Sequence, residues 1–157
     1  MKNIFILEDT LHVASAANLK LLNAGYQEEE IFHARTLLTA DYFINENPGL
    51  SSFRFFIVDL SIPDENFDTY FSDDEVKELY NISGNMCTEE NACLSGWIWI
   101  KRLLRRDKEI ARRIVILSAY VNELPEFEKT KYGGKMEFLD KRKVEAINDL
   151  YRIIKKK

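Results

Sequence analysis

The sequence predicts an α/β fold in which a parallel sheet carries helices on both faces. Two observations support this prediction. Five short apolar runs of strand length alternate with amphipathic segments along the chain. The run at 53–58 is apolar almost throughout, as in strands that are buried on both faces. The preference for right-handed crossovers leaves few strand orders open. We expect one domain over residues 1–157.

The expected elements follow in order along the chain. The strands are runs rich in β-branched, aliphatic and aromatic residues. They cover residues 3–7, 31–34, 53–58, 114–117 and 136–139. The helices are segments with apolar residues at helical spacing. They cover residues 11–24, 37–43, 96–107, 122–131 and 144–154.

Residues typical of helix ends support these boundaries. Thr10 and Thr36 can each cap the helix that follows. Gly25 can close the first helix, and Pro48 with its neighbours ends the second. The glycine pair at 133–134 breaks the fourth helix, and three final lysines suit the carboxyl end of the last.

Composition narrows the class of protein. A hydrophobic content of 46% and a charged content of 31% are ordinary for a soluble globular protein. The formal net charge of −4 gives no reason to expect a nucleic-acid partner. No segment has the length of a membrane span, and the apolar run at 4–7 is too short for a signal peptide. We therefore expect a cytoplasmic protein without a membrane partner.

The two cysteines, Cys87 and Cys93, are too few for a disulfide framework and are expected to be reduced thiols. Glu89 and Glu90 between them suggest a metal site, but two thiolates without a second ligand pair make a poor one.

Chemically reactive side chains stand where four of the five strands end. Because the carboxyl ends of parallel strands meet at one edge of a sheet, we expect these side chains to lie close together. Carboxylates hold a hard cation such as Mg²⁺, and a carboxylate can also attack phosphorus to form an acyl phosphate. Lysine and a hydroxyl bind phosphoryl oxygens. The residues are Glu8, Asp9, Asp59, Ser118 and Lys141.

The electrostatics of such a site favour a function. Asp59 taken alone could simply cap a helix or open a turn. Two carboxylates ~4 Å apart, however, repel by about 4 kcal/mol near a protein surface. Gathering three acids at one edge therefore indicates that a cation binds between them.

Four segments together resemble the receiver domain of two-component response regulators. They span nearly the whole chain apart from one insertion. The resemblance implies the flavodoxin-like (βα)5 fold, a parallel sheet of order 2-1-3-4-5 with helices on both faces. The matching segments are Ile6-Leu7-Glu8-Asp9, Ile57-Val58-Asp59-Leu60-Ser61-Ile62-Pro63, Ile116-Leu117-Ser118-Ala119 and Phe138-Leu139-Asp140-Lys141.

The resemblance implies that Asp59 accepts a phosphoryl group from a phosphohistidine. The donor would be a histidine kinase or a histidine phosphotransfer protein. Asp9, Asp59 and the backbone carbonyl of Ser61 would bind Mg²⁺, with Glu8 acting through water. Such a protein catalyses only its own phosphorylation and slow dephosphorylation, so it is not otherwise an enzyme. With no output domain after Lys157, it would be a single-domain regulator whose switched surface binds a downstream protein.

The resemblance also implies roles around the phosphoryl group. Ser118, the amide of Ala119 and Lys141 would hold its oxygens. Phe138 matches the aromatic residue that changes rotamer when the family switches, although it could equally be a plain core residue. Ser61 and Tyr120 would border the path of the attacking water. Tyr120 is bulky enough to obstruct that water, but it could also be simply an exposed aromatic residue.

Besides the missing output domain, two departures from the family pattern stand out. The family usually has proline after the lysine of the last strand, in a cis peptide, whereas this chain has Arg142. A trans peptide is then expected. Lys141 would enter the site from a different turn and engage only once a phosphoryl group is bound. The second departure is the length of the segment between Pro63 and the next amphipathic helix.

That insertion, residues 64–95, is strongly acidic. Nine acids and one base give it a charge of −8, so the rest of the chain carries +4. Disorder is the simple interpretation of such a stretch. Ser72 and Glu75, however, form a capping-box pattern ahead of aromatic and aliphatic residues. We expect a short helix near 76–80 that packs on the domain and serves as a lid or a docking surface.

Two other functions are alternatives to a phosphorylated receiver. A receiver-like module could bind a partner without phosphorylation, and a lost acid or lysine would favour it. A haloacid-dehalogenase-like phosphatase needs a second aspartate two residues after the nucleophile, where this chain has Ser61. His12 and His33 match no receiver role and are expected to be structural.

Overall fold

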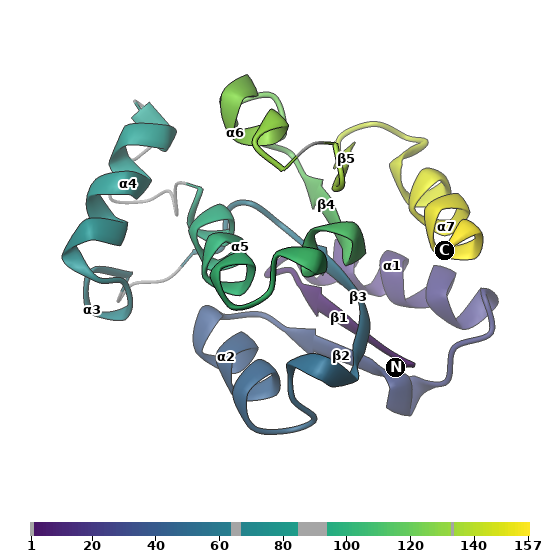
Figure 1. Ribbon diagram of the computed structural model, residues 1–157. Coiled ribbons are helices and arrows are strands. Elements are labelled where there is room, and N and C mark those ends of the chain that lie inside the picture. Colours follow the sequence, from purple (N-terminus) through teal and green to yellow (C-terminus); the bar gives the residue numbers. More distant parts are fainter. Residues whose placement is uncertain (1, 64–66, 85–93, 133) are drawn as a thin grey trace.

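The computed structural model describes residues 2–63, 67–84, 94–132 and 134–157, and its centre is a five-stranded sheet (Figure 1). The strand order is β2-β1-β3-β4-β5, and all four pairings are parallel. This is the flavodoxin-like order that the sequence predicted. The strands are β1 (Asn3–Leu7), β2 (Ile31–Ala34), β3 (Phe53–Val58), β4 (Ile114–Ser118) and β5 (Glu137–Asp140).

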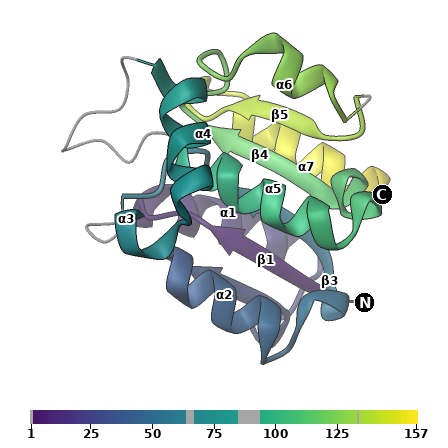
Figure 2. The ribbon, with the colours of Figure 1, turned by 60° about the vertical axis from the view of Figure 1, so that its left-hand side comes forward.

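Helices cover both faces of the sheet. Helices α1 and α7 pack on one face, while α2, α5 and α6 lie on the other (Figure 1). Two further helices, α3 and α4, belong to the insertion, and α4 lies against the outer side of α5 (Figure 2). The helices are α1 (Leu11–Asn23), α2 (Leu37–Asn45), α3 (Phe67–Tyr70), α4 (Asp73–Ser83), α5 (Ser95–Arg106), α6 (Glu126–Thr130) and α7 (Ala146–Lys156).

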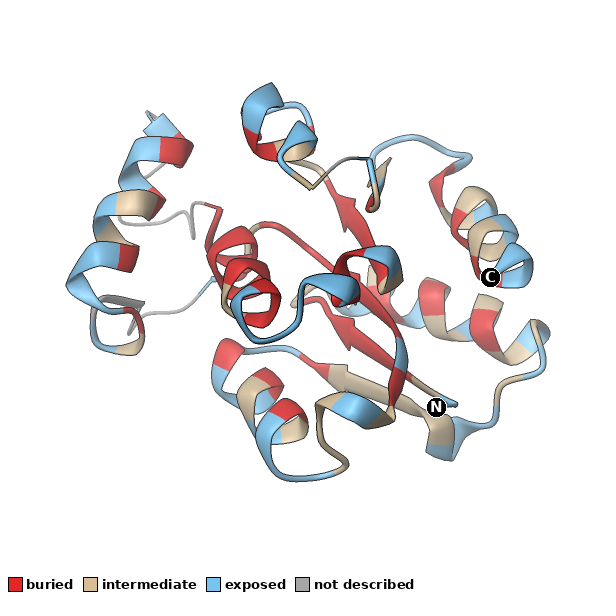
Figure 3. Cartoon of the chain, in the orientation of Figure 1, coloured by how far each residue is buried: buried red, intermediate tan, exposed pale blue. Residues whose placement is uncertain are grey.

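The alternation of side chains along the strands divides the core in two. In β1, Phe5 and Leu7 pack toward α2 and α5, whereas Ile4 and Ile6 pack toward α1 and α7. The central strands are buried almost throughout (Figure 3). A continuous apolar strand is therefore stable here because both of its faces are covered.

One expected helix cap and one expected helix boundary need correction. Thr10 is the N-cap residue of α1, as expected, but its side chain makes no capping hydrogen bond. Its own amide donates to Glu8 Oε1 at 2.9 Å. The helix expected over 122–131 begins only at Glu126. Pro125 precedes it, and proline has no amide hydrogen and cannot continue a helix from an earlier turn. The cap at Thr36 is confirmed, since its hydroxyl accepts the amide of Thr39 at 3.2 Å.

The helix expected in the insertion is confirmed as α4, and it is longer than predicted. Both hydrogen bonds of its capping box are present. Ser72 Oγ accepts the Glu75 amide at 3.2 Å, and Glu75 Oε1 accepts the Ser72 amide at 3.0 Å. The acids of its first turn suit the positive end of the helix dipole. Helix α4 packs against α5, so the described part of the insertion is folded onto the sheet's helical layer.

A cluster of charged and aromatic side chains fastens the insertion to α5 and α2. Arg102 donates to both oxygens of Glu75 at 2.6 and 2.7 Å, and its guanidinium lies 4.6 Å from the centroid of the Tyr70 ring. The Tyr70 hydroxyl and the Trp99 indole donate to the two oxygens of Asp41, at 2.5 and 3.0 Å. Four helices therefore share one network.

A second cluster joins α4 to α6 across α5. The ammonium of Lys101 pairs with Glu78 on α4 and with Glu128 on α6, the latter at 3.2 Å. The Trp97 indole also donates to Glu128 at 2.8 Å. Lys101 and Glu128 are buried, so the pair is shielded from solvent. A displacement of α6 would therefore disturb the ion pairs that connect it, through Lys101, to α4.

The Glu75 contact predicts a pH dependence of stability. Burial alone raises the pKa of Glu75, but hydrogen bonds from Arg102 and from the Ser72 amide outweigh it and lower the pKa to about 2. The ordinary pKa is 4.5, so the stabilisation is present above that pH and is lost as the pH falls toward 2. We expect Glu75→Gln to lower the free energy of unfolding by about 2 kcal/mol at pH 6 and by much less at pH 3.

Urea unfolding at the two pH values measures this difference. The matched control is Glu109→Gln, since Glu109 is largely exposed and pairs with Arg112 on the surface. Its effect should stay within about 0.5 kcal/mol at both pH values. A Glu75→Gln deficit that is the same at pH 3 and pH 6 would contradict the assignment.

Candidate functional site

The residues expected at the strand ends do come together. Backbone pairing continues one residue beyond two of the strands and fixes where their acids lie. The Glu8 amide donates to the Ala34 carbonyl at 3.1 Å, and the Asp59 amide donates to the Leu7 carbonyl at 2.9 Å. Both acids are 3% exposed. The sheet itself therefore holds two carboxylates side by side and nearly out of contact with solvent.

Asp59 is surrounded by hydrogen-bond donors. The Ser118 hydroxyl donates to Oδ1 at 2.5 Å, and the Lys141 ammonium donates to Oδ2 at 2.7 Å. The Ser61 amide also donates to Oδ1, at 3.3 Å. Because Ser118 Oγ accepts the amide of Tyr120 at 3.2 Å, its own hydrogen is directed toward Asp59. From its position, each of these donors could instead make its hydrogen bond to an oxygen of a group attached to the Asp59 carboxylate.

Lys141 already engages the site, which corrects the expectation that it would do so only with a phosphoryl group bound. Its ammonium bridges Asp59 and both oxygens of Glu8, the latter at 3.1 and 3.2 Å. The carboxylates attract it, since they are the nearest counter-charges in a buried setting. Their negative charge raises the pKa of Lys141 even though its burial lowers it.

The peptide after Lys141 is trans, as predicted, since the cis peptide among the described residues is Asn47–Pro48. The turn is closed by other means. The Lys141 amide donates to the Ser118 carbonyl at 3.2 Å, and Asp140 Oδ1 accepts the amide of Arg142 at 3.0 Å. Asp140 thus orders the turn in which the family usually has a proline.

Glu8 is the carboxyl group of the site whose ionisation is most strongly opposed. Burial and the neighbouring Asp59 carboxylate raise its pKa to about 7, and the Lys141 ammonium offsets this only in part. Two buried carboxylates share one ammonium here. An additional cation would stabilise both of them in their ionised form.

Three carboxylates are placed to hold such a cation. Glu8, Asp9 and Asp59 can each offer one oxygen, and these oxygens all lie within 4.8 Å of one another. Asp9 is only half-buried, so the group opens to solvent on its side. Oxygen ligands of this kind suit Mg²⁺ or Ca²⁺. The carbonyl of Ser61, expected as a further ligand, stays a prediction, because the contact seen at Ser61 is made by its amide.

Residues of β2 and α5 also support the site, and the sequence reasoning missed them. His33 Nε2 lies 2.7 Å from the Glu8 carbonyl, so His33 helps to fix the loop after β1. The role of His33 could have been predicted, because the strand order 2-1-3 places the end of β2 beside Glu8. Ser95 bonds to both the amide and the carbonyl of Ile62, at 3.1 and 2.9 Å, and so fixes the loop after β3.

Gly96 packs against the backbone of that same loop. Its amide donates to the Leu60 carbonyl at 2.9 Å. A Cβ at this position would lie 2.0 Å from the carbonyl oxygen of Asp59. Only glycine allows α5 to approach the loop after β3 so closely. The start of α5 is therefore part of the support of the site.

Two predicted residues lie beside the site and not in it. Tyr120 and Phe138 are both half-buried and pack against the core on the α5 side of the sheet. Tyr120 is thus not simply an exposed aromatic residue. The Lys129 ammonium lies 5.9 Å from the centroid of the Phe138 ring. The roles of Tyr120 in shielding and of Phe138 in switching stay predictions. Cys87 and Cys93, with Glu89 and Glu90, fall outside the described residues.

Within the described ranges, no helix is long and apolar enough to cross a membrane.

Comparison with known proteins identifies the fold. No family model and no curated protein match the sequence. Among solved structures, the chain is similar to a response regulator protein from Burkholderia pseudomallei, whose structure contains a phosphorylated aspartic acid, a calcium ion and citrate. The two share 16% sequence identity with a TM-score of 0.51, over 99% of this chain and 72% of the other. The chain therefore has the receiver fold seen in response regulators.

Proposed function

We propose that this protein is a phosphoacceptor receiver that takes a phosphoryl group onto Asp59. One observation carries the proposal. The Asp59 carboxylate lies buried between a hydroxyl and an ammonium, with two further carboxylates in reach of a shared cation. A structural aspartate has no need of this combination. The donor would be a phosphohistidine on a histidine kinase or a histidine phosphotransfer protein.

The chemistry divides among the residues of the site. A carboxylate oxygen of Asp59 attacks phosphorus, the phosphorus–nitrogen bond to the imidazole breaks, and the imidazole leaves with its electron pair. Mg²⁺, held by Glu8, Asp9 and Asp59, would neutralise the phosphoryl charge. Ser118 and Lys141, which now donate to Asp59, would donate to the phosphoryl oxygens instead.

This exchange of partners suggests how the signal leaves the site. Ser118 ends β4, and its Oγ accepts the amide of Tyr120 in the segment that leads to α6. A shift of Ser118 toward a phosphoryl group would displace that segment and α6, with Phe138 adjusting beside them. We propose that the displaced surface binds a downstream protein in the cytoplasm. Apart from its own phosphorylation and slow dephosphorylation, the receiver would catalyse no reaction.

Intact-mass measurement tests the phosphorylation. The full chain is incubated with acetyl phosphate in Mg²⁺ or in EDTA. We expect one phosphoryl group to be added in Mg²⁺ only, and to be removed by hydroxylamine, which cleaves acyl phosphates. Failure to acquire a phosphoryl group in Mg²⁺ would favour the alternative, an interaction module that acts without phosphorylation.

The metal site makes a separate prediction. Without metal, Asp9→Asn should raise the melting temperature, since it removes one of three crowded negative charges. Mg²⁺ at about 100 times its dissociation constant should stabilise the wild type by about 2.7 kcal/mol, or roughly 5–11 °C, and the variant much less. Asp149→Asn, on α7 and outside the carboxylate group, should respond to Mg²⁺ as the wild type does. If Mg²⁺ raised the melting temperatures of Asp9→Asn and the wild type equally, the assignment of Asp9 as a metal ligand would be contradicted.

A further inference from the structure

A pocket lies at the end of the sheet opposite to Asp59. Lys2 precedes β1 and Arg54 is the second residue of β3, whereas Glu8 and Asp59 follow the far ends of the same strands. Since a strand rises about 3.3 Å per residue, roughly 16 Å separates the pocket from the carboxylates. Its volume is about 480 Å³, which is ample for a small organic molecule.

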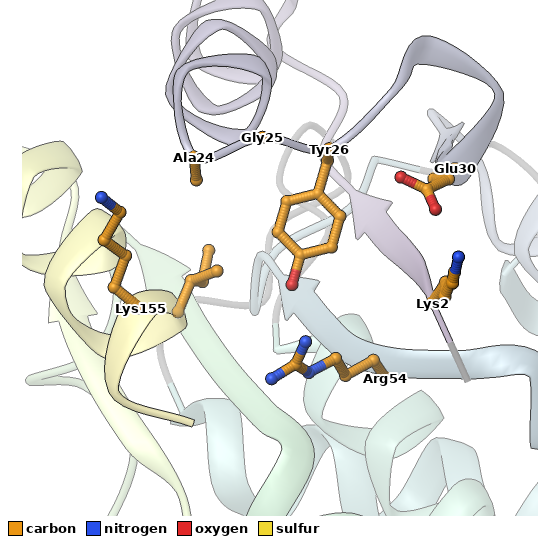
Figure 4. Close-up of a pocket in the computed structure, with 8 residues that line it drawn as sticks. Lys2, Ala24, Gly25, Tyr26, Glu30, Arg54 and Lys155 are labelled. Atoms are coloured by element: carbon orange, nitrogen blue, oxygen red, sulfur yellow. The ribbon is translucent and has the colours of Figure 1, made fainter.

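A register shift in the sheet places Arg54 in this pocket. Asn3 pairs with Phe53 and Ile4 pairs with Phe55, so Arg54 has no partner on β1. Phe53 and Phe55 consequently enter opposite halves of the core, and Arg54 is the one exposed residue of β3. An extra residue of this kind re-aims a side chain. Figure 4 shows the Arg54 guanidinium facing the Tyr26 hydroxyl across the pocket.

The pocket carries an excess of positive charge. Lys2, Arg54 and Lys155 line it, against one carboxylate, that of Glu30. None of the three cations forms an ion pair with a carboxylate of the described residues. An oxygen of Glu30 already accepts the Gln27 amide at 2.9 Å, within its own turn. The surplus of two positive charges matches a dianion.

We propose that this pocket binds a small organic phosphate monoester. The planar guanidinium of Arg54 suits two phosphate oxygens at once, and the Tyr26 hydroxyl can donate to a third. The ammonium groups of Lys2 and Lys155 balance the remaining charge. Ile154 and the Tyr26 ring form an apolar wall for the organic substituent. This site is independent of the phosphoryl chemistry proposed for Asp59.

Titration calorimetry of the metal-free full chain tests the proposal, with phenyl phosphate as the probe. We expect saturable binding of one equivalent, at least tenfold tighter than that of the monoanion benzoate, and none detectable for phenol. Arg54→Gln should weaken phenyl phosphate binding at least tenfold. Arg112→Gln, which changes an exposed arginine outside the pocket, should leave it unchanged, as should Asp59→Asn.

Two outcomes overturn the proposal. One is the absence of saturable binding, and the other is binding that survives Arg54→Gln but is lost in Asp59→Asn. If Arg54→Gln fails to fold by circular dichroism, Lys155→Gln decides the question, and it must weaken binding several-fold. Amide chemical shifts provide a second readout, since phenyl phosphate should move the signals of Gly25 and Tyr26 in the wild type.

Discussion

Replacing Gly96 by alanine should destabilise the protein by about 3 kcal/mol, the upper part of the range for overpacked sites. The added Cβ would lie 2.0 Å from the Asp59 carbonyl oxygen and 3.1 Å from the carbonyl carbons of Asp59 and Leu60. These are backbone atoms that no change of rotamer can move aside. Either α5 or the loop after β3 must shift. Thermal unfolding should show a fall in melting temperature of roughly 6–12 °C.

Loss of phosphoryl uptake should accompany the loss of stability, because the shifted loop carries Asp59, the proposed phosphoacceptor. Gly84→Ala is the control. Gly84 has a φ of +53° and nothing within 4 Å of an added Cβ. It should lose stability through backbone strain and retain phosphoryl uptake in Mg²⁺. If Gly96→Ala takes up phosphoryl groups as readily as wild type, the tight contact between α5 and the loop after β3 is not required for phosphoryl uptake.

Replacing Lys141 by methionine should also have a large effect on stability, and the size of that effect should depend on metal. Without metal, the variant leaves Glu8 and Asp59, each 3% exposed, with no ammonium between them. Removing one partner of a buried ion pair destabilises a protein by about 3–5 kcal/mol. We expect metal-free Lys141→Met to unfold at a correspondingly lower denaturant concentration.

Mg²⁺ should stabilise Lys141→Met more than it stabilises the wild type. In the wild type the ammonium and the metal act on the same carboxylates, whereas in the variant the metal alone supplies positive charge. Denaturant unfolding with and without Mg²⁺ measures both values. A variant that loses stability equally in the two conditions would contradict the shared role of these carboxylates. Lys143→Met, at an exposed position of the same loop, is the control.

The parts of this structure that follow from local pattern could be predicted from the sequence. Strand order and the convergence of Glu8, Asp59 and Ser118 follow from alternating elements in a parallel sheet, whose carboxyl ends share an edge. The helix of the insertion follows from its capping box, since Ser72 and Glu75 satisfy each other within one turn. Both inferences depend on neighbours in sequence or on a general rule of topology.

The remainder depends on contacts between distant segments. Lys141 engages without a phosphoryl group because two buried carboxylates attract it more strongly than solvent does. Gly96 gives no local signal, since its importance arises from the Asp59 carbonyl 37 positions earlier in the chain. Arg54 could not be assigned to a pocket before the register shift was known.

The most direct test of the central claim is to locate the phosphoryl group. Protein treated with acetyl phosphate and Mg²⁺ is reduced with sodium borohydride, which converts an aspartyl phosphate to homoserine, and its peptides are sequenced by mass spectrometry. We expect homoserine at position 59 in the wild type, none in EDTA, and none in Asp59→Asn. Homoserine at another aspartate, or phosphate found on a serine or threonine, would contradict the assignment of Asp59 as the phosphoacceptor.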